Sequence, residues 1–244
     1  RVLLTELMKN LEINITQIKE DIEWDSVAIS SGKIIMNVLN NKISYSDTLD
    51  SHFQNSRLVP NSFLTTSSYK AIENRGFHIV SSIFLRKKIM KLFDDTYPSM
   101  ILEINNIDEN TLKTNMQNYM INHFEYSNGQ LKPNDYQELL EDQRYRNILS
   151  YNIEIQGYFK RKRIDCLKQV ELLIEEIDNE LLNFINTKLE LYNKLSEDMF
   201  TQDWRARLEH SNLLESALSS DQGLSLPGSE AGIAEGILGS VNNH

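Results

Sequence analysis

Residues 148–195 read ILSYNIEIQGYFKRKRIDCLKQVELLIEEIDNELLNFINTKLELYNKL, and this stretch carries the longest apolar pattern in the chain. Its apolar residues follow a three–four rhythm with slips, which places them along one stripe of a helix. They are Ile148, Ile155, Phe159, Cys166, Val170, Leu173, Ile177, Leu181, Phe184, Leu191 and Leu195. Asn134 and Gln137 have the spacing of a capping box. The pattern predicts one helix over residues 134–200, with the seam of a coiled coil or bundle.

A second long apolar pattern opens the chain. Its members are Leu4, Leu7, Leu11, Ile15, Ile18 and Ile22, and it predicts a helix over residues 1–40. We therefore expect an all-α, elongated helical bundle in which two long, coiled-coil-like helices pack antiparallel and several short helices lie between them. No stretch alternates strictly between apolar and polar residues, so little or no sheet is expected. We assign residues 1–200 to this bundle domain.

Capping and turn residues predict the shorter elements. Helices are expected at about 67–75, 83–95 and 106–124. Ser82 is a candidate cap of the second helix, and Pro98 ends or kinks it. Asn106 and Glu109 resemble a capping box that opens the third helix. Asn128, followed by glycine, marks a turn.

Residues 201–244 differ in composition from the rest of the chain. Five acidic residues and no lysine or arginine follow Arg207, and five of the nine glycines lie here. Leu208, Leu213, Leu214 and Leu218 fit a short amphipathic helix. We interpret this Gly/Ala/Ser-rich acidic tail either as a linker or docking segment, or as an extension of different origin. The composition does not decide between the two.

The composition disfavours several classes of function. The net charge of −10 argues against nucleic-acid binding and against adsorption to an anionic membrane surface. A single cysteine, Cys166, excludes an intrachain disulfide, and its helical surroundings predict a small core residue. No apolar run is long enough to cross a bilayer. The first residue, Arg1, already lies in a helix pattern, so we expect the sequence to be a fragment of something longer or a processed product.

The motifs of catalytic and metal sites are missing from the sequence. It contains no HExxH, no Glu-x-x-His pair, no glycine-rich phosphate loop and no GxSxG. The histidines are scattered and read as core or surface residues rather than metal ligands. They are His52, His78, His123, His210 and His244. We predict no catalytic, cofactor-binding or metal-binding residues, no cofactor, and no enzymatic activity.

One dense basic run, Lys160, Arg161, Lys162 and Arg163, is the candidate partner contact. Four consecutive helical residues point all round the axis, so they cannot form a single anion pocket. A solvated collar is the simpler interpretation. The other interpretation is a head-to-tail or antiparallel charge match between two copies, because an acidic stretch at 171–180 lies on the same predicted helix.

Four stretches resemble a known family, and two of them carry most of the resemblance. They are SYSDTLDSHF at 44–53 and FLTTSSYKAIENRGFHIVSSIFLRKKIMKLFDDTYPSM at 63–100. Together with HFEY at 123–126 and NDYQELLEDQRYRNIL at 134–149, they resemble an uncharacterised family of bacterial single-pass membrane proteins. The matching positions include Ser68, Tyr69, Gly76, Ile79, Leu85, Arg86, Tyr97 and Pro98. The resemblance covers roughly residues 1–190, and the tail departs from it.

The resemblance implies a location but no activity. It implies a transmembrane helix that this fragment lacks, and the positive-inside rule then places the domain in the periplasm. We expect a non-enzymatic, membrane-anchored interaction or scaffold domain that binds a protein partner or self-associates, most simply as a homodimer. The alternative is a periplasmic helical-bundle sensor that binds a small ligand. A sensor needs a pocket with convergent polar groups, whereas a scaffold needs an exposed apolar or charged face.

Overall fold

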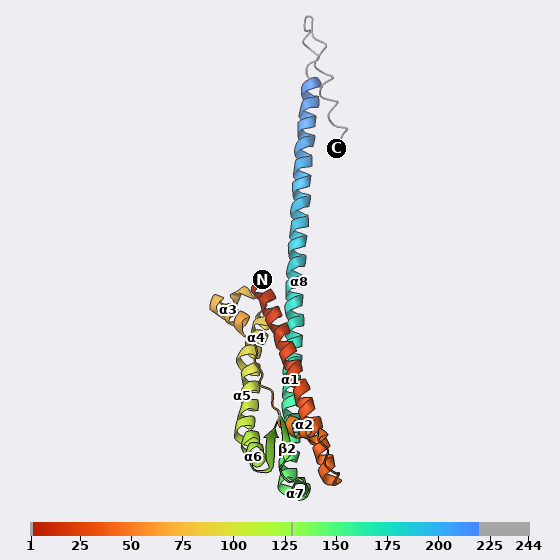
Figure 1. Ribbon diagram of the computed structural model, residues 1–244. Coiled ribbons are helices and arrows are strands. Elements are labelled where there is room, and N and C mark those ends of the chain that lie inside the picture. Colours follow the sequence, from red (N-terminus) through yellow and green to blue (C-terminus); the bar gives the residue numbers. More distant parts are fainter. Residues whose placement is uncertain (1, 128, 220–244) are drawn as a thin grey trace. The chain divides into compact units, whose positions relative to one another are not determined.

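The computed structural model describes residues 2–127 and 129–219, and the chain divides into two compact units, Arg1–Phe184 and Ile185–His244 (Figure 1). The helices are α1 (Val2–Asn40), α2 (Thr48–Asn55), α3 (Ser67–Arg75), the 3₁₀ turn η1 (Phe77–Ile79), α4 (Ile83–Met90), the π-helical η2 (Lys91–Thr96), α5 (Tyr97–Ile107), the π-helical η3 (Asp108–Gln117), α6 (Asn118–His123), α7 (Tyr136–Glu141) and α8 (Gln143–Ser219). The strands are β1 (Phe124–Ser127) and β2 (Gln130–Pro133). Helix α8 contributes to both units.

In unit 1, α1 and the first part of α8 pack antiparallel, as predicted (Figure 1). Lys19 lies 3.3 Å from Glu171, and Asp25 lies 2.6 Å from Arg163. Moving toward the C-terminus of α1 therefore means moving toward the N-terminus of α8. The predicted all-α bundle with two long antiparallel helices is confirmed.

A third long helical segment packs on this pair. The run from α4 to α6 covers 83–123 and stays helical, whereas the sequence predicted two helices interrupted near Pro98 and restarted at Asn106. Pro98 lies just after the π-helical η2, and this local departure from α-helical hydrogen bonding lets the run continue past a residue that lacks an N–H. Asn106 lies inside α5 and is no cap, so the predicted capping box is wrong. Ser82 does cap α4, because its hydroxyl accepts from the Leu85 backbone N–H.

The predicted start of the last helix differs from the observed start in three ways. A two-stranded antiparallel hairpin precedes it, pairing Phe124 with Pro133, and Gly129 in its turn has a φ of +78°. Asp135, not Asn134, caps α7 by accepting from two backbone N–H groups. The predicted single helix is broken at Asp142, whose carboxylate accepts from the backbone N–H groups of Arg144 and Tyr145 in the first turn of α8.

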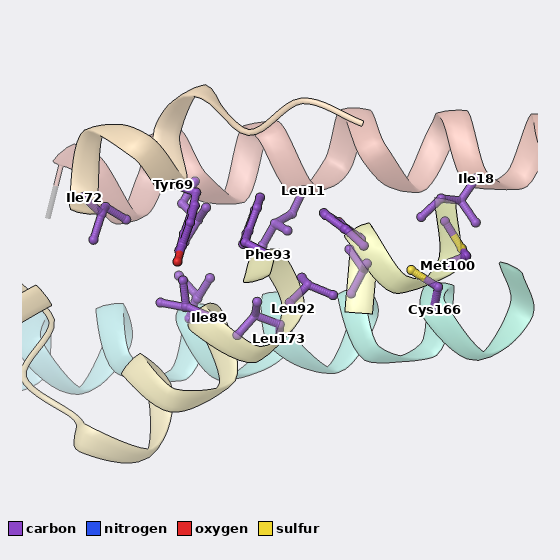
Figure 2. Packing of buried hydrophobic residues seen from close by; sticks show 14 of the residues in the cluster. Leu11, Ile18, Tyr69, Ile72, Ile89, Leu92, Phe93, Met100, Cys166 and Leu173 are labelled. Atoms are coloured by element: carbon purple, nitrogen blue, oxygen red, sulfur yellow. The ribbon is translucent and has the colours of Figure 1, made fainter. Parts of the chain in front are cut away.

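Two apolar clusters form the core of unit 1. The larger one joins α1, α3, the α4–α5 segment and α8, and Figure 2 shows Leu11, Phe93 and Leu173 converging from three of these elements. Cys166 is buried in this cluster, which confirms the predicted core position. The smaller cluster surrounds Phe53 and joins α1, α2, the hairpin, α6, α7 and the start of α8. The larger cluster uses the predicted stripes of α1 and α8.

The predicted domain boundary at residue 200 does not coincide with a helix end. Helix α8 continues to Ser219, and the division into two compact units falls between Phe184 and Ile185 of the chain. Leu208 and Leu213 therefore belong to the long helix rather than to a separate short one. Most of the predicted tail, 220–244, lies outside the described residues, so its interpretation stays a prediction.

Candidate functional site

The predicted basic collar is divided by the fold. Arg163 is fully buried, and its Nη1 donates to both carboxylate oxygens of Asp25 at 2.7 and 2.6 Å. Its Nη2 donates to the Pro60 carbonyl at 2.7 Å. Because successive helical residues are turned by about 100°, one residue of any such run must face the neighbouring helix. Arg163 is that residue, so it is not available to a partner.

The remaining collar residues lie at the surface of unit 1. Lys162 is half-buried, donates to Glu103 on α5 at 2.8 Å, and lies over the Tyr158 ring. The Lys162 hydrogen bond holds the pKa of Glu103 below its usual value. Arg161 is exposed and Lys160 is half-buried. Contact between these residues and a partner stays a prediction.

The acidic partners of Arg163 were not expected from the sequence. Asp21 and Asp25 are buried on α1, and Asp21 Oδ2 lies 3.7 Å from Arg163 Nε. Burial raises the pKa of Asp25 to about 6, although Arg163 acts to lower it. The only available signal was that both carboxylates follow the three–four rhythm of the apolar stripe.

These buried polar groups hold an extended segment, residues 56–66, between the long helices of unit 1. Its backbone accepts hydrogen bonds from α8 side chains, Asn152 at Ser56 and Gln156 at Leu58, at 2.5 and 2.7 Å. On the α1 side, Asn14 accepts from the Thr65 backbone N–H at 2.7 Å and donates to its carbonyl at 3.0 Å. Because a segment without secondary structure must satisfy its backbone elsewhere, these groups have a structural role.

A cleft opens beside this segment. Its volume is about 340 Å³, and a second hollow of about 230 Å³ shares Leu112, Met116 and Asn152 with it. The lining comes from the extended segment, from η3 and from α8, and includes the polar residues Arg57, Asn61, Asp108, Lys113, Asn115, Gln117 and Asn147. Side-chain amides therefore predominate among its polar groups. One wall is π-helical, and such segments occur frequently at functional sites.

Unit 2 presents a different surface, because the apolar stripe of α8 remains uncovered there. Ile177 in unit 1 is 0% exposed, whereas Tyr192, Met199 and Phe200 in unit 2 are 70–74% exposed. Within the described part of unit 2, the other large exposed apolar residues are Ile185, Leu189, Leu191, Leu195, Trp204, Leu208 and Leu213. Soluble monomers rarely expose a contiguous apolar surface of this kind, and such surfaces mark interaction sites.

We name the most regular part of this surface the seam face, defined as Ile185, Leu189, Tyr192, Leu195, Met199 and Phe200. These residues recur at steps of three, four and one, which keeps them on one side of the helix. Leu191 and Leu195 belong to the predicted stripe of α8. The stripe alone does not show that these two residues are exposed and lie outside the two buried clusters of unit 1.

Ion sites, membrane spans and relatives complete the description. Within residues 2–127 and 129–219, no three histidine, cysteine, aspartate or glutamate side chains are grouped to hold a metal ion. Over the same described range, no helix is sufficiently long and apolar to cross a membrane. Comparisons with protein-family models, curated proteins and solved structures found no match to this chain.

Proposed function

We propose that this protein is a non-enzymatic interaction or scaffold domain that binds a helical partner through the seam face of α8. The exposure of this face is the observation that supports the proposal. Burying one large apolar side chain contributes about 1.5–3 kcal/mol, so a partner that covers six of them gains substantial free energy. An exposed apolar stripe on a helix, such as the seam face, is typical of helix-to-helix recognition.

The membrane setting of this proposal comes from the sequence resemblance. We propose that a transmembrane helix outside this sequence anchors the domain to a bacterial membrane, with the domain on the periplasmic side. The net charge of −10 supports a protein partner rather than nucleic acid or an anionic lipid surface. Unit 1 then serves as a folded body, whose core consists of two apolar clusters with the buried Arg163–Asp25 pair between its long helices.

The proposal is tested by an affinity pull-down of the full-length protein from its native cell after mild crosslinking. The test variant combines Leu189→Glu with Tyr192→Glu, which places two charges on the seam face. Thr201→Glu with Asn212→Glu is the matched control, because both positions are exposed and lie on the opposite side of the helix. We expect the wild type and the control to retain a stoichiometric partner, and the test variant to lose it.

Equal recovery by the test and control variants would refute the seam face as the contact. Circular dichroism of both variants checks that neither has lost helix. Neutralising Lys160 and Arg161 in the same experiment shows whether the exposed part of the collar adds to the contact.

A ligand-binding sensor is the second candidate, and the cleft beside residues 56–66 favours it. Asparagine and glutamine amides donate and accept, so they suit neutral polar ligands such as sugars or amino acids. The test is a thermal-shift screen of such compounds with Gln117→Trp, which narrows the cleft that this residue lines, and Asn118→Trp as the exposed control outside it. A stabilisation that Gln117→Trp alone abolishes supports a sensor, and no stabilisation by any compound argues against it.

A further inference from the structure

The seam face continues as a heptad pattern. Counting from Ile185, every seventh residue is Ile185, Tyr192, Met199 and Ala206, which are the d positions of a coiled coil. The a positions are Leu189, Ser196, Asp203 and His210. All eight residues are exposed in unit 2. Leu195 and Phe200 flank this stripe at g and e, which widens its apolar surface.

The a and d positions of this heptad hold both large and small residues. A parallel, in-register pair of copies stacks each residue on itself, so Ser196 and Ala206 leave underfilled layers. It also places Asp203 against Asp203, and two carboxylates at one desolvated position repel each other. The sequence of this face therefore disfavours a parallel homodimer.

An antiparallel pair centred between residues 197 and 198 resolves each of these conflicts. Leu189 lies opposite Ala206, and Met199 lies opposite Ser196, so a large side chain meets a small one in each layer. Ile185 lies opposite His210 at the ends, where the histidine can reach water. The shape and the polarity of the face are therefore complementary to the same face turned round.

Tyr192 lies opposite Asp203 in this register. The Tyr192 hydroxyl can donate to the Asp203 carboxylate across the seam, and the pairing occurs twice because the dimer is symmetric. Within its own helix, Asp203 already has a counter-ion, since its carboxylate lies 3.1 Å from Arg207 Nη2. The carboxylate thus keeps a charged partner when the layer closes.

We propose that residues 185–210 of α8 form an antiparallel two-stranded coiled coil with the same residues of a second copy, with Tyr192 opposite Asp203. The proposal rests on the proposed function, because it takes the seam face to be the interaction surface and names its occupant. Twenty-six residues at a rise of about 1.5 Å give a seam of about 39 Å.

Spin-label distances in the full chain test the orientation. Single labels are placed at Asn212→Cys and at Glu197→Cys, both in a Cys166→Ala background, and measured by double electron–electron resonance. In the antiparallel dimer, residue 212 lies level with residue 183 of the other copy, so the Asn212 labels are separated by about 44 Å along the axis. The Glu197 labels lie near the centre and give a short distance of about 10–20 Å, set by the helix separation. Short distances at both sites mean a parallel dimer and overturn the proposal.

The Tyr192→Phe variant tests the pairing with Asp203. Loss of two symmetric hydrogen bonds to a carboxylate is expected to weaken dimerisation by about 100-fold, measured by analytical ultracentrifugation. Tyr126→Phe is the control, because this tyrosine is exposed on the hairpin of unit 1. Equal dimerisation of both variants overturns the assigned register.

The two proposals fail in different ways. A full chain that sediments as a monomer at tens of micromolar overturns the antiparallel homodimer. If the pull-down from cells still recovers a different protein, and the Leu189→Glu, Tyr192→Glu variant loses it, the seam face remains the interaction site. If the chain is a monomer and the Leu189→Glu, Tyr192→Glu variant recovers the same proteins as the wild type, the proposed function is overturned as well.

Discussion

Arg163→Met is the most informative change to the bundle, because it removes the centre of the buried polar network in unit 1. Arg163 and Asp25 are both fully buried and joined by two hydrogen bonds of 2.7 and 2.6 Å. Methionine fills much of the same space but leaves the Asp25 carboxylate and the Pro60 carbonyl without their donor. Breaking a buried ion pair from one side costs about 3–5 kcal/mol, so we expect the free energy of unfolding to fall by that amount.

The cost of Arg163→Met depends on pH in a defined direction. Burial already raises the pKa of Asp25 to about 6 in the intact protein, and loss of Arg163 raises it further because that guanidinium acts to lower it. Between pH 8 and pH 6 the variant can bind a proton that the intact protein does not bind. The cost of the substitution therefore falls as the pH falls, by up to about 1.4 kcal/mol per pH unit.

The assay is urea unfolding followed by the fluorescence of Trp24, which adjoins Asp25, in a Trp204→Phe background. Arg161→Met is the matched control, because Arg161 is exposed on the same helix and should cost less than about 0.5 kcal/mol. Combining Arg163→Met with Asp25→Asn should recover part of the loss, since no buried charge remains. A cost for Arg163→Met no larger than for Arg161→Met would refute the reasoning.

Three further predictions concern unit 1. In the intact protein, Asp25 contributes its full stabilisation below its unfolded pKa near 3.8, and this contribution is lost as the pH rises through about 6. Asp25→Asn should therefore flatten the pH dependence of the free energy of unfolding between these two values, measured from urea midpoints. Gly32→Val should destabilise by about 1–3 kcal/mol in thermal melts, because even a Cβ at this position lies 2.7 Å from the Ile153 side chain, whereas Gly129→Asn in the open hairpin turn is the tolerated comparison. Burial raises the pKa of the Cys166 thiol to about 12, so it should react with a thiol reagent only in urea, and rapid reaction of the folded protein would contradict its core position.

The helices that could be predicted are those set by local periodicity. The stripe of Leu4, Leu7 and Leu11 on α1 and that of Phe159, Val170 and Ile177 on α8 both lie in the core, because an amphipathic helix must bury its apolar side. The interruption at Asn106 was wrong, since a residue with capping chemistry can remain inside a helix when its neighbours are packed.

The candidate sites depended on contacts between distant parts of the chain. In the sequence, Arg163 is one of four consecutive cations that look equivalent. Only the fold shows that it pairs with Asp25, 138 positions away. The cleft combines residues 57–61, η3 and Asn152, which no local pattern connects. The apolar residues of α8 beyond Phe184 continue the predicted core stripe in sequence, and only the structure shows that they are exposed.

Site-specific photo-crosslinking in cells tests the central claim most directly. A photoreactive phenylalanine derivative replaces Tyr192, on the seam face, and in a separate variant Thr201, which lies on the opposite side of α8. We expect a discrete adduct from position 192 and none from position 201, with the mass of the adduct identifying a second copy or another protein. Adducts of equal yield from both positions, or from neither, would contradict the assignment of the seam face as the interaction site.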